Sequence, residues 1–66
     1  MESIRIKDRY NDFKEWEIIK LSGGYYLKQY VKGKQFGRGF RTTKKYIESI
    51  LEIKISYTLD SGLEIL

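Results

Sequence analysis

Short runs of β-forming residues, separated by turn residues, fill the first half of the chain. Ser3–Lys7 alternates apolar and polar positions and predicts a short strand, which the turn-forming segment Asp8–Lys14 ends. Trp16–Leu21 predicts the next strand, and Ser22–Gly24 supplies a tight hairpin turn. Tyr25–Val31 is the richest stretch in β-branched and aromatic residues and predicts the strongest strand.

A third hairpin strand and then a change of period follow. Lys32–Gly33 predicts a second turn, and Gln35–Arg41 predicts a strand that two glycines weaken. From Thr42 the apolar residues take up helical spacing, and either Thr42 or Thr43 suits the N-cap. The apolar stripe of this helix comprises Tyr46, Ile47, Ile50, Leu51 and Ile53.

The end of the chain alternates again. Ile55–Leu59 predicts a strand, Asp60–Gly62 a turn, and Leu63–Leu66 a returning strand. The whole pattern predicts an α+β fold in a single domain of residues 1–66. An antiparallel sheet of three to four strands packs against one helix, with a C-terminal hairpin.

The register of the hairpins assigns side chains to two faces of the sheet, because side chains alternate along a strand. The face expected to meet the helix is the apolar one, made of Trp16, Ile18, Tyr25, Leu27, Val31, Phe36 and Phe40. The other face holds Tyr26, Lys28 and Tyr30, with Glu17 beside Lys28 as an expected ionic partner. Lys20 and Arg38 fall on the apolar side by the same parity.

Charge is concentrated in one stretch of the chain. Residues 18–47 contain no Asp or Glu and hold eight of the thirteen Lys and Arg residues. The flanks are acidic, so the net charge of +4 conceals a cationic segment, which indicates an anionic partner.

Composition excludes several classes of chemistry. The chain has no Cys and no His, so it lacks a thiolate nucleophile, the commonest general base and the commonest metal ligands. We expect no catalytic residues, no metal site and no cofactor, and therefore no enzyme. No apolar run approaches about 18 residues, so we expect no membrane span, and the cytoplasm is the default location.

Two groups of residues form the candidate binding site. The first follows the central strand and its turn, where lysines suit phosphates and tyrosines can stack on bases. The second surrounds the start of the helix, where free amides and lysines would converge on an anion. Together they comprise Tyr26, Lys28, Tyr30, Lys32, Lys34, Arg41, Thr42, Lys44 and Lys45. The same pattern is also typical of a solvated outer face with no ligand.

The order of three strands and one helix, with Gly24–Tyr26, Gly33–Lys34 and Phe40–Lys45 in it, resembles a known family. The family comprises the small DNA-binding domains of phage and transposon tyrosine recombinases, which share their shape with plant AP2-type domains. The resemblance covers Trp16–Leu51. It implies a sheet face in the DNA major groove, and a small regulator or accessory factor of a mobile element. The contacts that it implies come from Lys20, Tyr26, Lys28, Tyr30, Arg38 and Arg41.

The leading hypothesis is therefore a module that binds nucleic acid, with double-stranded DNA favoured over RNA or a single strand. The alternative is a protein-interaction module, a small inhibitor or adaptor that docks onto an acidic partner surface. A homodimer through the sheet edges also fits the sequence.

Overall fold

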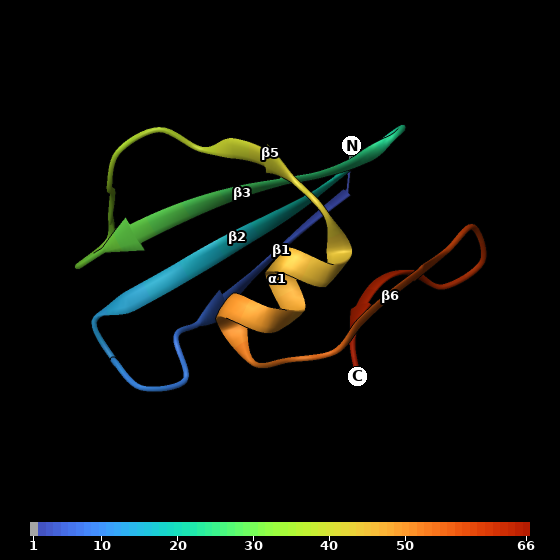
Figure 1. Cartoon of the computed structure of the whole chain (residues 1–66). Helices are drawn as coiled ribbons and strands as arrows, with labels where there is room; N and C mark the ends of the chain where they lie inside the picture. The colour runs from blue at the N-terminus through green and yellow to red at the C-terminus, as the bar shows by residue number, and fades with distance from the viewer. Residues whose placement is uncertain (1) are drawn as a thin grey trace.

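The computed structural model describes residues 2–66 as a sheet with one helix and a separate hairpin on it (Figure 1). This arrangement confirms the predicted α+β fold, including the C-terminal hairpin. The elements are β1 (Glu2–Lys7), β2 (Lys14–Leu21), β3 (Gly24–Val31), β4 (Lys34–Gln35), β5 (Phe40–Thr42), α1 (Lys44–Leu51), β6 (Ile55–Thr58) and β7 (Gly62–Ile65).

The main sheet is antiparallel, in the order β1-β2-β3, and β4 and β5 both pair with β3. Ile18 of β2 stands opposite Leu27 of β3, which is the register that a two-residue turn predicts. The second turn, Lys32–Gly33, has positive φ at both residues (52° and 85°). Such a turn matches the right-handed twist of a β-hairpin, although Lys32 is not a residue that favours this conformation.

The predicted third strand of the hairpin series is interrupted. β4 ends at Gln35 opposite Tyr30, and β5 begins at Phe40 opposite Leu27, so four residues stand against two residues of β3. Gly37 lies within the interruption with a φ of 69°, a conformation that glycine adopts without strain. The interrupted segment has two more residues than the part of β3 opposite it, and an even number keeps the alternation of side chains. Phe40 therefore still has the parity of the core side, as predicted.

The core lies on one side of the sheet. Ile18 and Leu27 are fully buried there, and α1 and the β6–β7 hairpin both cover that side (Figure 1). The buried cluster comprises Trp16, Ile18, Tyr25, Leu27, Ile47, Leu51, Ile55 and Leu63. One side of the sheet therefore carries the whole second layer.

Two parts of the predicted core are wrong. Phe36 and Phe40 are 63% and 43% exposed, because they lie at the interrupted edge of the sheet, where α1 reaches only Phe40, through Tyr46. On α1 only Ile47 and Leu51 are buried, whereas Tyr46 and Ile50 are 44% and 45% exposed. A helix of eight residues presents one narrow stripe to the sheet, so Tyr46 and Ile50 face solvent, and Ile53 of the predicted stripe lies beyond the end of α1.

Asp8 organises the connection between β1 and β2. Its carboxylate accepts hydrogen bonds from the Trp16 indole Nε1 (2.9 Å) and from the backbone amides of Tyr10 (3.0 Å) and Asn11 (3.1 Å). The indole hydrogen bond is the main cause that holds the pKa of Asp8 below its ordinary value of 3.8. Asp8 therefore stabilises the fold in its charged form.

We expect Asp8→Ala to lower the free energy of unfolding by about 1–3 kcal/mol, because it leaves the Trp16 indole without its acceptor. Because the folded pKa is depressed, the stabilisation is present above pH 3.8 and is lost as the pH falls through the folded pKa. Urea denaturation of wild type and variant between pH 7 and pH 2.5 measures both effects. Asp12→Ala, in the same connection, is the control, and an equal loss in that variant would contradict the assignment.

Candidate nucleic-acid interface

The face of the sheet opposite the core carries neither α1 nor the hairpin, and we call it the open face. Its centre is a shallow hollow of about 350 Å³ between β2 and β3. The residues around the hollow are Ile19, Leu21, Tyr26 and Lys28. An apolar floor with one tyrosine and one lysine suits a ligand that has both flat apolar and anionic parts.

Two of the predicted site residues, Tyr26 and Lys28, line this hollow, and Arg41 lies beside Tyr26 on the neighbouring strand. Tyr26 pairs with Arg41 of β5, and Lys28 follows two positions along β3 on the same face. Gly39 lies against the Tyr26 ring, so closely that an added Cβ there would collide with it. The absence of a side chain at Gly39 thus allows Tyr26, Lys28 and Arg41 to lie side by side.

Tyr30 shares the open face but is already engaged. The Arg5 guanidinium lies 3.6 Å from the centre of the Tyr30 ring, and the Tyr30 hydroxyl donates to Glu17 Oε1 (2.7 Å). This hydrogen bond is the main cause that raises the pKa of Tyr30. Arg5 in turn donates from Nε to Glu15 Oε1 (2.8 Å). Tyr30 is therefore part of a neutralised cluster, and its ring is covered by a cation.

Glu17 faces Lys28 across the strands, as predicted, but its Oε1 accepts the hydrogen bond from Tyr30. The expected Glu17–Lys28 ion pair is wrong. The salt bridges within residues 2–66 join Arg5 to Glu15 and Arg9 to Glu52, and both lie outside residues 18–47. Within residues 2–66, none of the eight basic side chains of residues 18–47 forms a salt bridge with a carboxylate.

The remaining candidates lie at the two ends of β3. Lys34 pairs with Val31 next to the turn that contains Lys32, whereas Thr42 pairs with Tyr25 at the opposite end. The two pairs are six residue steps apart along β3, which is roughly 20 Å. Lys34 and Thr42 take the parity of the core side, so they border the open face without belonging to it.

The helix start joins the Thr42 end of the sheet. Thr43 is the N-cap, and its hydroxyl accepts from the Tyr46 amide (3.2 Å), which confirms one of the two predicted caps. Lys44 and Lys45 occupy the first turn, where no acidic residue offsets them. Cations at a helix N-terminus oppose the helix dipole, so a nearby anion would stabilise this arrangement.

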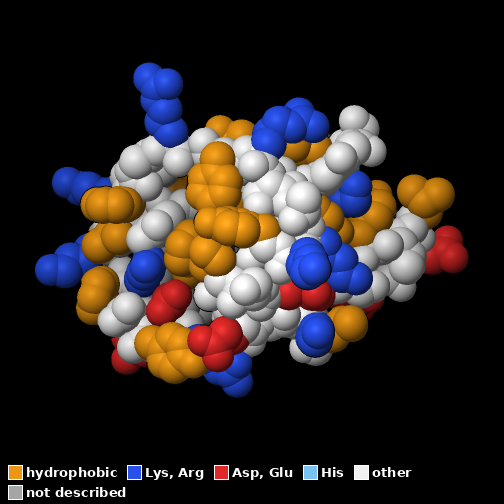
Figure 2. Space-filling model, viewed as in Figure 1, with side chains coloured by type: hydrophobic (Ala, Val, Ile, Leu, Met, Phe, Trp, Pro, Cys, Tyr) orange, Lys and Arg blue, Asp and Glu red, His pale blue; other side chains and the backbone are white. Residues whose placement is uncertain are grey.

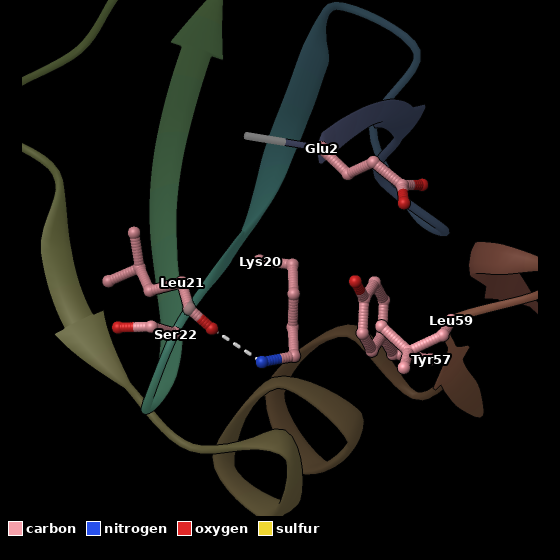
Figure 3. A pocket seen from close by; sticks show the side chains of 6 residues that line it. All are labelled: Glu2, Lys20, Leu21, Ser22, Tyr57 and Leu59. Atoms are coloured by element: carbon pink, nitrogen blue, oxygen red, sulfur yellow. Dashed lines mark hydrogen bonds between the residues drawn. The ribbon is translucent and has the colours of Figure 1, made fainter.

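Lys20 points away from the open face, as the register predicts. Its Nζ donates to the Leu21 carbonyl and lies 5.3 Å and 4.9 Å from the ring centres of Tyr25 and Tyr57 (Figure 3). It lines a separate hollow of about 330 Å³ between the β2–β3 turn and the C-terminal hairpin. The side chains around this hollow are those of Glu2, Lys20, Leu21, Ser22, Tyr57 and Leu59 (Figure 3).

Sequence reasoning missed the contribution of β1 to the open face. Arg5 pairs with Glu17, and this pairing brings its guanidinium over Tyr30. The alternation of Ile4 and Ile6 with polar residues already indicated that Arg5 would face away from the core. The sequence did not show that β1 pairs with β2, and this pairing is what places Arg5 near Tyr30.

Comparisons with known proteins add no identification. No family model matches the chain, and the searches of curated proteins and of solved structures give no significant match. Within the described residues, no helix has both the length and the apolar character needed to cross a membrane.

Proposed function

We propose that this protein binds nucleic acid, with double-stranded DNA as the favoured ligand, through the open face of its sheet. The observation that carries the proposal is the set of basic side chains around this face that no carboxylate neutralises. Affinity for a duplex comes largely from lysine and arginine contacts to phosphates. A surface whose cations have no partner within the protein is suited to such contacts.

The arrangement of the cations supports a duplex ligand. Cations lie beyond both ends of β3, whose paired residues Tyr25 and Val31 are roughly 20 Å apart, and Lys28 and Arg41 lie along the strands between those ends. The DNA major groove is about 12 Å wide, with a phosphate backbone on each side. A two- or three-stranded face inserted there brings its centre to base edges and its ends to the two backbones. We assign Tyr26 and Lys28 to the bases, and the turn and helix-start cations to phosphates.

Binding to a fluorescently labelled 16-base-pair duplex, measured by anisotropy between 50 and 200 mM salt, tests the proposal. We expect affinity to fall with a log–log slope of about −0.9 for each phosphate contacted. Lys28→Glu and Arg41→Glu should each weaken binding about tenfold or more, because each replaces a cation of the open face with a carboxylate. Lys54→Glu, which follows α1 in the other layer, makes the same change of net charge and is the matched control.

A flat salt dependence, or equal losses in all three variants, would contradict the proposal. Equal losses would show that only net charge matters and that the open face has no special part. The setting that the resemblance suggests, a regulator or accessory factor of a mobile element in the cytoplasm, rests on duplex binding and falls with it.

A second candidate function is docking onto an acidic protein, because within residues 2–66 β7 pairs with β6 alone. On the outer edge of β7 the Leu63 amide donates to Glu2 (2.8 Å), and the edge beyond it is unpaired in these residues. Ile65 and Leu66 next to that edge are 40% and 75% exposed. An added strand from a partner, or from a second copy, could pair there. Affinity capture from a nuclease-treated lysate separates the two functions, since only a protein partner survives the nuclease.

A further inference from the structure

Four apolar side chains are exposed together where the interrupted sheet edge meets α1. Phe36 is 63% exposed, and Phe40, Tyr46 and Ile50 are each 43–45% exposed. We call this group the aromatic edge. Figure 2 shows hydrophobic side chains gathered near the centre of this view, between the β4–β5 segment and α1, with Lys and Arg side chains around them.

The aromatic edge is continuous. The rings of Phe40 and Tyr46 meet edge to face, with centroids 5.9 Å apart and planes at 79°. Ile50 lies one helical turn after Tyr46, on the same side of α1. The Phe36 amide donates to the Gln29 carbonyl (2.8 Å), two residues along β3 from the partner of Phe40. This places Phe36 about 7 Å from Phe40 along the edge.

Cations border this group. Lys34 precedes Phe36 by two residues on β4, Arg38 lies between Phe36 and Phe40, and Lys45 precedes Tyr46 in the first turn of α1. All three cations are exposed, and none makes a salt bridge within residues 2–66.

The carboxylates of α1 and its C-cap point elsewhere. Glu48 accepts from the backbone amide of Ile55 (2.9 Å), and Glu52 accepts from the Tyr10 hydroxyl (2.8 Å). Three cations therefore border the aromatic edge, and none of them is paired with a carboxylate within residues 2–66. Its ligand must combine negative charge with flat apolar surface.

We propose that the aromatic edge binds the unpaired bases of a single-stranded nucleic acid. Bases would stack on Phe36 and on the Phe40–Tyr46 pair, while Lys34, Arg38 and Lys45 contact the phosphates between them. Three of the four apolar side chains are rings, and base stacking on rings tolerates any sequence. The four apolar side chains lie on the helix side of the sheet and take no part in the proposed duplex contacts, so stacking there is tested separately from duplex binding, although Lys34 and Lys45 border both sites.

A labelled dT15 strand, titrated by anisotropy at 50 mM salt beside the duplex, tests the inference. Phe36→Ala and Tyr46→Ala should each weaken dT15 binding roughly 5- to 150-fold, the effect of losing one stacked base. Phe36→Leu and Tyr46→Leu keep an apolar side chain but lose the ring, and we expect them to weaken binding as well. Duplex affinity should stay unchanged in all four variants.

Phe13→Leu is the matched control, since Phe13 is a similarly exposed ring (53%) beside the start of β2. It should bind dT15 as wild type does. Circular dichroism of every variant checks that it folds. We expect every variant to fold, because the substituted side chains are exposed.

Three results would overturn the inference. The first is a wild-type protein that does not bind dT15 at 50 mM salt. The second is full binding by the leucine variants, which would mean apolar contact without stacking. The third is a dimer in sedimentation that Phe36→Glu dissociates, which would assign the edge to a second copy of the chain. If Lys28→Glu loses duplex binding but keeps dT15 binding, the result supports a single-strand site at the aromatic edge that is separate from the open face.

Discussion

Leu27→Ala is expected to unfold most of the protein at 25 °C. Leu27 is fully buried at the centre of β3, between Ile18 of β2 and Phe40 of β5. Truncation of a buried leucine costs about 2–5 kcal/mol. A domain of fewer than about 70 residues rarely has more than roughly 3–5 kcal/mol of stability from its core. Urea denaturation followed by Trp16 fluorescence and far-UV circular dichroism measures the loss.

The neighbours of Leu27 provide the control, because Tyr26 and Lys28 point to the open face. Lys28→Ala should change stability by no more than about 0.5 kcal/mol and should reduce only duplex affinity. Leu27→Met, which roughly conserves volume, should cost less than about 1.5 kcal/mol. A Leu27→Ala protein as stable as wild type would contradict the central position of this residue.

This contrast explains why so much of the fold could be predicted. Side chains alternate along β3, and the two-residue turn fixes which residues of β2 stand opposite. The buried pair of Ile18 and Leu27 and the exposed pair of Tyr26 and Lys28 both follow from that register. The change of period limits the N-cap to Thr42 or Thr43, and the structure shows Thr43 there.

What the sequence could not show depends on distances between elements. The pattern of Phe36 and Phe40 is that of core residues, but the helix is too short to cover the interrupted edge. Tyr30 has the parity of a binding residue, but β1 brings Arg5 over its ring. Each of these outcomes is decided by a neighbour that is remote in sequence, and local periodicity carries no information about it.

Gly39→Ala is the substitution expected to damage the fold and the open face together. An added Cβ would collide with the Tyr26 ring and would lie 2.9 Å from Lys28 Cγ and 3.0 Å from the backbone oxygen of Leu27. The side chains can move, but the carbonyl belongs to the central strand and cannot. We expect a loss of about 1–3 kcal/mol in stability, as for other overpacked sites.

We also expect duplex affinity to fall in this variant, because relief of the collision displaces Tyr26 and Lys28 from the hollow. Gly23→Ala is the matched control, since an added Cβ at Gly23 meets nothing within 4 Å. That variant should keep both stability and affinity. Equal behaviour of the two alanine variants would contradict the close packing at Gly39.

A double-mutant cycle between Gly39→Ala and Tyr26→Ala identifies the cause of the damage. If the Tyr26 ring is the main obstacle, its removal relieves the added Cβ, and the double variant is more stable than the sum of the single losses predicts. Coupling between residues in contact is typically about 0.5–3 kcal/mol. Strictly additive losses would instead assign the damage to the Leu27 carbonyl. Duplex binding would then depend on the position of β5 itself, and Arg41 would move with that strand.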